Sequence, residues 1–128
     1  HGSIRSPLWK GGGVTFGPTK DKNYSKKINK KMVKAAVYAV LSKKLKEGEL
    51  KIIDNLKLDQ PKTKLMSRIL KNMSNSTLLI PASDNKLIYR ASANIPKTEV
   101  QAPASLNVYD LLKYKNVLIE RGAVESIR

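Results

Sequence analysis

Hydrophobic and polar positions alternate between two patterns over most of this chain. Short runs rich in apolar residues predict strands at 50–53, 77–80, 98–101 and 116–120. Apolar residues spaced three or four apart predict helices between and after them, at 61–74, 87–94, 107–113 and 122–128. Strands that alternate with helices are typical of an α/β fold. The pattern therefore predicts a mostly parallel sheet with helices on its faces, a Rossmann-like three-layer domain.

Individual residues refine these elements. Pro61 suits the first position of a helix, and Pro96 closes the helix before it. Asn107 suits an N-cap, with Asp110 favourably placed in the first turn that follows. The run 77–80 is almost wholly apolar, which is typical of a strand covered on both faces.

Another helix is predicted before this body, from about Lys30 to Glu47. Asn29 suits its N-cap, Gly48 follows its end, and Ile28 is placed for a hydrophobic staple with a residue of the first turns. Its predicted apolar face consists of Met32, Val33, Ala36, Val37, Val40 and Leu41.

The start of this helix contradicts local electrostatic preference. Five lysines crowd the positive end of the helix dipole: Lys26, Lys27, Lys30, Lys31 and Lys34. Each such placement costs about 0.3–1 kcal/mol at an exposed site. Local rules tend to fail where function overrides them, so we predict a phosphate site here, to which Tyr38 adds a ring. The alternative is a lysine-rich, solvated surface.

The first 25 residues show neither helical period nor strand alternation. Five of the seven glycines lie within the first 17 residues, beside Pro7 and Pro18. Such a segment cannot offset its ordering entropy by burial, so it is either a tail or a loop that becomes ordered on a partner. Trp9 and Phe16 favour RNA, because bases stack on rings while nearby cations meet phosphates. The alternative is that both rings fold back onto the domain.

Charge divides the chain in the same place. The net charge is +15, and residues 1–46 hold 12 Lys/Arg against the single acid Asp21. Residues 47–128 hold 13 Lys/Arg against nine acids. This asymmetry predicts an extended basic arm at 1–25, joined to an α/β domain at 26–128, and a polyanionic partner.

Several functional classes are disfavoured. The chain has no Cys and its one histidine is His1, so disulfides and His- or Cys-based metal sites are not expected. No apolar run is long enough for a membrane span, and the start does not resemble a signal peptide. G-x-x-x-x-G-K-[ST] is absent, and Phe16 stands where G-x-G-x-x-G needs its last glycine. We therefore expect no cofactor and no small-molecule substrate.

The sequence also offers little evidence for a catalytic site. Asp54, Ser83 and Asp84 follow predicted strands, where ligands of α/β sheets commonly bind. No nucleophile, base or glycine-rich loop joins them, and turn chemistry explains all three. A nucleotide-binding α/β enzyme remains the alternative from another class.

Four segments carry a specific resemblance: GSIRSPLWKGGGVTFGP at 2–18, INKKMVKAA at 28–36, PKTK at 61–64 and SLNVYDLLKYKNVLIERGAVESI at 105–127. They resemble the bacterial-type family of large-subunit ribosomal protein four, over essentially the whole chain. The resemblance implies an α/β domain on the large subunit and a long basic loop that reaches into ribosomal RNA near the exit tunnel. It also implies neighbouring ribosomal proteins as partners, a role in subunit assembly and no chemistry. Some members repress their own operon through its messenger leader, so a free RNA regulator stays open.

The resemblance also implies which residues meet RNA. Residues 2–18 look like the returning half of the basic loop, and the opening basic pair of the helix is matched as well. The expected RNA-binding residues, including further cations chosen on charge, are Arg5, Ser6, Trp9, Lys10, Gly11, Gly12, Gly13, Lys20, Lys22, Lys26, Lys27, Lys30, Lys31 and Lys34.

Two departures from the family pattern limit these implications. The family's N-terminal strand region and the outgoing half of the loop have no counterpart, so we expect a fragment, from a bacterial cytoplasm or an organelle. Most of the tunnel-facing tip lies in that missing part. In addition, Ser92-Ala93-Asn94-Ile95 replaces the usual Ala-Arg-Asn-Leu, so no contact of that arginine is expected here.

Overall fold

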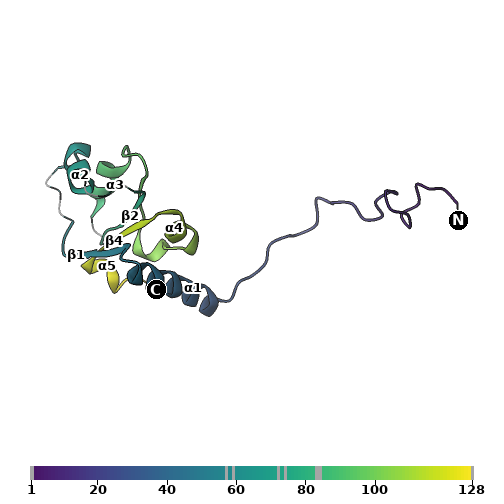
Figure 1. Cartoon of the computed structure of the whole chain (residues 1–128), viewed down its shortest axis with the longest axis horizontal. Helices are drawn as coiled ribbons and strands as arrows, with labels where there is room; N and C mark the ends of the chain where they lie inside the picture. The colour runs from purple at the N-terminus through teal and green to yellow at the C-terminus, as the bar shows by residue number, and fades with distance from the viewer. Residues whose placement is uncertain are drawn as a thin grey trace.

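A four-stranded parallel sheet forms the centre of the domain in a computed structural model, which describes residues 2–56, 58, 60–71, 73, 75–82 and 85–127 (Figure 1). Its strands are β1 (Leu50–Ile53), β2 (Thr77–Ile80), β3 (Thr98–Val100) and β4 (Asn116–Glu120). They pair in the order β1-β4-β2-β3, and every pairing is parallel. The helices are α1 (Lys30–Lys46), α2 (Thr63–Leu70), α3 (Lys86–Ser92), α4 (Val108–Lys113) and α5 (Arg121–Val124), with a short 3₁₀ helix η1 (Pro103–Ser105). The predicted α/β class with a parallel sheet is confirmed.

Two hydrophobic clusters show how the helices cover the sheet. One cluster joins side chains of α1, α4 and α5 to Leu78 and Ile80 of β2 and to Val117 of β4. The other joins α2 and α3 to Leu79 of β2 and Leu118 of β4. Because successive strand residues face opposite ways, these clusters lie on opposite faces of the sheet. All four residues of β2 are buried, as its apolar sequence predicts.

Some predicted element ends are confirmed and others are wrong. Asn107 Oδ1 accepts a hydrogen bond from the backbone N–H of Asp110 at 2.8 Å, which confirms the cap of α4. Pro61 is not the first residue of α2, because Lys62 is still extended and acts as N-cap. The helix ends at Leu70, and the end predicted near Ser74 lies outside the described residues. α3 ends at Ser92, two residues before the predicted end.

A buried lysine ties α1 to the rest of the domain. Lys44 is 5% exposed, and its Nζ donates to Glu49 Oε2 at 3.0 Å. The same ammonium donates to the backbone carbonyls of Tyr114 and Lys115, each at 2.9 Å. Tyr114 is the C-cap of α4, so the positive charge lies at the negative end of that helix. All three ammonium hydrogens are used, which offsets the cost of burying the charge.

Burial of α1 is confined to its C-terminal half. Val37 is 3% exposed, and Val40 and Leu41 pack against the same cluster. Met32 and Val33 are 62% and 45% exposed, so the predicted apolar face is wrong for the first turns. Those turns extend beyond the edge of the domain, toward the N-terminal segment (Figure 1).

α4 is also joined to the edge strand β3. The Tyr114 hydroxyl donates to Glu99 Oε2 at 2.5 Å, and this hydrogen bond, together with burial, raises the pKa of the phenol. Lys113 Nζ lies 3.4 Å from the same carboxylate oxygen. The charge of Lys113 is therefore paired with Glu99 within the domain.

Replacement of the buried lysine tests its contribution. Lys44→Met is expected to lower the free energy of unfolding by about 2–4 kcal/mol, because a carboxylate and two carbonyls lose their donor. Urea unfolding followed by circular dichroism measures this change. Lys43→Met is the control, since Lys43 is exposed and its 3.9 Å ion pair with Glu47 should contribute under about 1 kcal/mol. Equal, small losses in both variants would contradict the assigned role of Lys44.

Candidate nucleic-acid interface

The N-terminal segment, residues 2–29, contains neither helix nor strand. In Figure 1 it runs from the start of α1 away from the sheet. Apart from the partly buried Ser6 and Gly12, its residues are exposed. Phe16 is 94% exposed and Trp9 is 49% exposed. The alternative that both rings fold back into the domain core is therefore not supported.

Residues 3–13 form a compact run of turns, here called the N-terminal loop. Its backbone hydrogen bonds run from Ser6 N to Ser3 O, Trp9 N to Ser6 O and Gly12 N to Trp9 O, each 3.0 Å, and from Gly13 N to Arg5 O at 2.9 Å. The Ser3 hydroxyl also accepts from the Arg5 N–H at 3.2 Å. The expectation of no internal order in this segment is therefore wrong for the loop.

Two glycines have structural reasons within the N-terminal loop. A Cβ on Gly12 would lie 1.9 Å from the carbonyl oxygen of Ser6, so no side chain fits there. Gly11 has φ +87°, a conformation that other residues rarely adopt. The sequence suggested that these glycines let the backbone approach RNA. The structure shows that Gly11 and Gly12 are already required to close the loop.

The predicted cations of this region are all exposed. They are Arg5, Lys10, Lys20, Lys22, Lys26, Lys27, Lys30, Lys31 and Lys34. Within the described residues, the ion pairs involve Lys43, Lys44, Lys113 and Arg121, and none of the nine cations. Two of the nine lie over aromatic rings: Lys22 over Tyr24 at 5.2 Å and Lys34 over Tyr38 at 5.6 Å. The region thus presents positive charge that the domain's own acids do not neutralise.

The structure of the first turn of α1 is compatible with the phosphate site that its lysines predict. Its first turn holds no acid, and the Asn29 side chain makes no capping hydrogen bond. The first N–H groups of a helix have no partner within the helix, so those of Lys30 and Lys31 point outward. Free N–H groups and ammonium groups at a helix start are a favourable arrangement for a phosphate. That a phosphate binds here remains a prediction.

The catalytic alternative gains no support from the carboxyl ends of the strands. The Asp54 side chain is 88% exposed and lies 3.8 Å from Arg121, while Ser83 and Asp84 lie outside the described residues. A different acid, Glu120, occupies the end of β4 and is 6% exposed. Its two carboxylate oxygens accept from Leu56 N at 3.3 Å and from Ala82 N at 2.7 Å. Glu120, which the sequence patterns did not reveal, is therefore committed to joining two loops.

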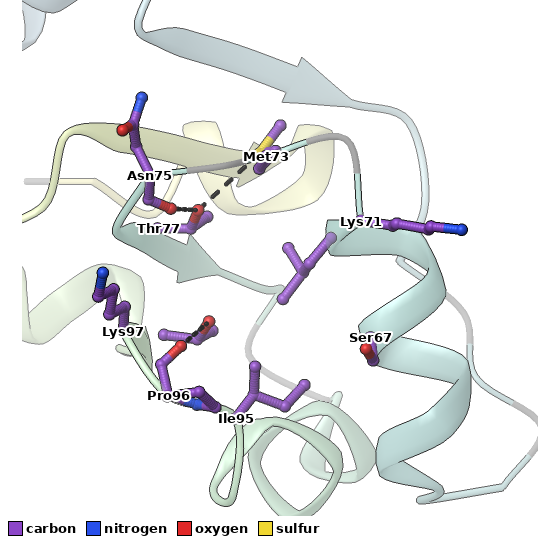
Figure 2. Close-up of a pocket in the computed structure, with 10 residues that line it drawn as sticks. Ser67, Lys71, Met73, Asn75, Thr77, Ile95, Pro96 and Lys97 are labelled. Atoms are coloured by element: carbon purple, nitrogen blue, oxygen red, sulfur yellow. Dashed lines mark hydrogen bonds between the residues drawn. The ribbon is translucent and has the colours of Figure 1, made fainter.

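A hollow of about 230 Å³ lies at the other edge of the sheet, between α2 and the starts of β2 and β3 (Figure 2). Ligands of α/β sheets bind at the carboxyl ends of strands, which is the opposite edge. In Figure 2 the amino groups of Lys71 and Lys97 point away from each other rather than into the hollow. The Thr77 hydroxyl is already bonded to the Asn75 carbonyl at 3.1 Å. The hollow therefore lacks the converging polar groups of a nucleotide site.

Two further searches concern only the part of the chain that the structure describes. There, no three His, Cys, Asp or Glu side chains gather in a way that would hold a metal ion. In the same residues, no helix has the length and apolar character needed to cross a membrane.

Comparison with known proteins gives a consistent result. The family model described as "Ribosomal protein L4/L1 family" matches residues 1–128. Relatives named "Large ribosomal subunit protein uL4" include one from Pelotomaculum thermopropionicum, 44% identical over 128 residues, and one from Mycoplasma mycoides, 42% identical over 130 residues. In both alignments 99% of this chain is covered, and it spans 62% of the length of the relative. Since the family model matches the whole chain, this protein belongs to the ribosomal protein L4/L1 family, whose members are ribosomal proteins and not enzymes.

Proposed function

We propose that this chain is a structural constituent of the large ribosomal subunit that binds large-subunit ribosomal RNA through its N-terminal segment and the start of α1. The family and the names of its relatives support a place in that subunit. The observation that carries RNA binding is the set of nine exposed cations without an acidic partner among the described residues. RNA phosphates supply the missing negative charge, and release of their counterions provides much of the affinity.

In this proposal the two predicted segments of the chain have different roles. Residues 1–25 act as the extended basic arm, and residues 26–128 act as the α/β platform. Trp9 and Phe16 stack on unpaired bases, because both rings present exposed surface beside cations. Backbone N–H groups and lysines at the start of α1 hold phosphates. All the residues that the sequence predicted for RNA binding belong to this one continuous stretch, 5–34.

The platform gives the N-terminal segment its direction. Lys44 and Val37 fix the C-terminal half of α1 on the domain, and the first half of the same helix extends beyond it. A rigid helix therefore leads from the sheet to the basic segment. Its exposed Met32 and Val33 provide apolar surface for a neighbouring ribosomal protein or for the RNA itself.

The family supports a proposal for where the chain acts. We place the chain in bacterial ribosomes, in the cytoplasm, where it supports subunit assembly in the region near the exit tunnel. Binding to its own messenger leader would use the same cations. We favour ribosomal RNA as the ligand, because the family that matches the chain is ribosomal.

Salt dependence tests the electrostatic account. If five to eight phosphates are contacted, the logarithm of the association constant should fall against the logarithm of salt concentration with a slope of about −4 to −7. Filter binding of transcribed large-subunit ribosomal RNA, repeated across a series of KCl concentrations, measures the slope. Binding that does not change with salt would contradict the proposal.

Neutralisation of the helix start separates binding from stability. The triple variant Lys30→Gln, Lys31→Gln, Lys34→Gln should bind ribosomal RNA at least about tenfold more weakly and show a slope shallower by about 2–3. Its thermal unfolding temperature should stay equal or rise, because three cations leave the positive end of the helix dipole. The same titration and a thermal melt provide both readouts.

The matched control removes the same charge elsewhere. Lys43→Gln, Lys46→Gln, Lys113→Gln replaces three exposed lysines, of which Lys43 and Lys113 face domain acids. Its affinity should stay within about threefold of the native chain, while its stability should fall slightly, since Lys43 and Lys46 favour the negative end of α1. A large loss of stability in the Lys30, Lys31 and Lys34 variant would mean that those lysines are structural.

A further inference from the structure

A groove runs along α2, on the side that faces the segment between α3 and β3. The hollow of about 230 Å³ in Figure 2 forms one part of it, and a second hollow of about 330 Å³ forms the other. Both hollows are lined by Ser67, Ile95 and Pro96, so they adjoin each other. We call the two together the α2 groove. Its lining residues extend from Thr63 at the start of α2 to the C-cap Lys71, about 12 Å at 1.5 Å per residue.

Apolar side chains form much of the lining of the first hollow. Leu70 is 7% exposed, and Met73 and Ile95 are partly buried against the same hydrophobic cluster. Pro96 adds a further apolar surface that is exposed. An apolar cavity of about 150 Å³ is large enough to bind benzene. The hollow of about 230 Å³ therefore has room for one aliphatic or aromatic side chain of a partner.

Three exposed lysines flank this apolar lining. Lys71 and Lys97 line the first hollow, and Lys64 lines the second. Figure 2 shows Lys71 and Lys97 on opposite sides of the first hollow. Among the described residues, no Asp or Glu lines the groove, and no ion pair includes any of the three lysines. The α2 groove thus has an apolar centre with positive charge on either side.

The backbone of Lys97 indicates that its side chain has a use. Lys97 has φ +58°, a left-handed conformation that glycine adopts more readily than lysine. Its carbonyl accepts a hydrogen bond from the Thr77 N–H at 2.9 Å, at the point where β2 begins to pair with β3. A glycine would suit this position better for stability alone. A residue that breaks a local rule in this way is a candidate for a functional contact.

These features favour an extended peptide over RNA. A phosphate is held by donors that converge on it, whereas the amino groups of Lys71 and Lys97 point away from each other. Unpaired bases stack on aromatic rings, and no described residue that lines the groove is aromatic. An extended peptide rises about 3.3 Å per residue, so about four residues span the groove. An apolar anchor in a pocket with a polar rim is the usual arrangement at protein interfaces.

We propose that the α2 groove binds a short, extended, acidic segment of a partner protein. One apolar side chain of this segment enters the first hollow, and carboxylates before and after it lie against Lys71 and Lys97. Complementarity between these carboxylates and the unpaired lysines of the rim is the reason for choosing an acidic partner. The inference goes beyond the proposed function, because it requires neither RNA nor the N-terminal segment.

Methyl NMR can locate the bound peptide because the chain has three methionines in different surroundings. Met73 lines the groove, Met66 is fully buried, and Met32 lies in the exposed first turns of α1. The probe is an acetylated pentapeptide with one leucine between two pairs of glutamates, titrated into the full chain labelled at its methionine methyl groups. The Met73 signal should shift and saturate, while the Met32 signal should not move. A shift of Met32 without a shift of Met73 would place the peptide on the basic start of α1 and overturn the proposal.

A second peptide separates specific binding from attraction to a basic chain. It has glycine in place of leucine and keeps all four glutamates. Because it lacks the anchor for the hollow, it should leave the Met73 signal in place and bind at least about tenfold more weakly in fluorescence anisotropy. Equal binding of the two peptides would contradict the proposal.

A blocking variant tests the groove without changing charge. Ser67 is exposed and lines both hollows, so Ser67→Trp should fill the groove and weaken binding of the leucine peptide at least about tenfold. Ile69→Trp is the matched control, since Ile69 is 44% exposed on the same helix and does not line the groove. Equal affinity of the two variants would overturn the proposal. So would a loss of affinity for transcribed large-subunit ribosomal RNA in Ser67→Trp alone, because the groove would then be an RNA contact.

A charge variant tests the rim and does not depend on the folding of Ser67→Trp. Lys71→Gln, Lys97→Gly should bind the leucine peptide about five- to tenfold more weakly, as expected for two exposed ion pairs. Its thermal unfolding temperature should stay equal or rise, because glycine suits the φ of Lys97. Lys43→Gln, Lys46→Gln removes equal charge elsewhere and should stay within about twofold of the native affinity. Equal losses in the two variants would contradict the role of the rim, and circular dichroism checks that every variant is folded.

Discussion

The buried ammonium of Lys44 is the contact on which the arrangement of this protein depends. A charge removed from water is strongly destabilising unless its hydrogen-bonding capacity is filled. Here one carboxylate and two carbonyls fill it, at 2.9–3.0 Å. The contact joins α1 to residues about 70 positions later in the chain, at the end of α4. It therefore fixes the C-terminal half of α1 on the domain, while the first turns of α1 extend beyond the domain and continue into the basic N-terminal segment.

Cations of this chain fall into two physical groups. In one group, Lys43, Lys44, Lys113 and Arg121 have acidic partners within the domain, and the buried contact of Lys44 stabilises the fold. The other cations that the structure describes, which include all those before residue 43, have no such partner among the described residues. Some of them stand at helix starts, where they oppose the helix dipole. The fold tolerates this because the sheet is covered on both faces, and we infer that RNA supplies the opposing charge at the start of α1.

The sequence predicts those features of the fold that depend on residues close together in the chain. The four strands, the parallel arrangement, the Asn107 cap and the end of α1 at Gly48 follow from local spacing and residue type. Pro61 was misplaced because a proline suits the residues before a helix as well as its first position. The first turns of α1 have an apolar face that local periodicity cannot distinguish from a buried one.

Contacts between residues far apart in the chain cannot be predicted from local sequence patterns. Lys44 and Glu120 look like ordinary surface charges in the sequence, and only the fold brings their partners to them. The close approach of Gly12 to Ser6 likewise depends on a turn geometry that the triple glycine does not specify. The candidate RNA-binding residues were predicted from charge and from family resemblance. The structure adds that all of them except the partly buried Ser6 and Gly12 are exposed.

Amide hydrogen exchange, with and without large-subunit ribosomal RNA, tests most directly whether RNA rather than the domain holds the N-terminal segment. Residues 14–28 have few backbone hydrogen bonds, such as Lys22 N to Thr19 O at 3.3 Å, so their amides should exchange rapidly in the chain alone. On RNA these amides should become strongly protected, while those of β2 and β4 stay protected in both states. Protection of residues 14–28 before RNA is added, or no change when it is added, would contradict this account.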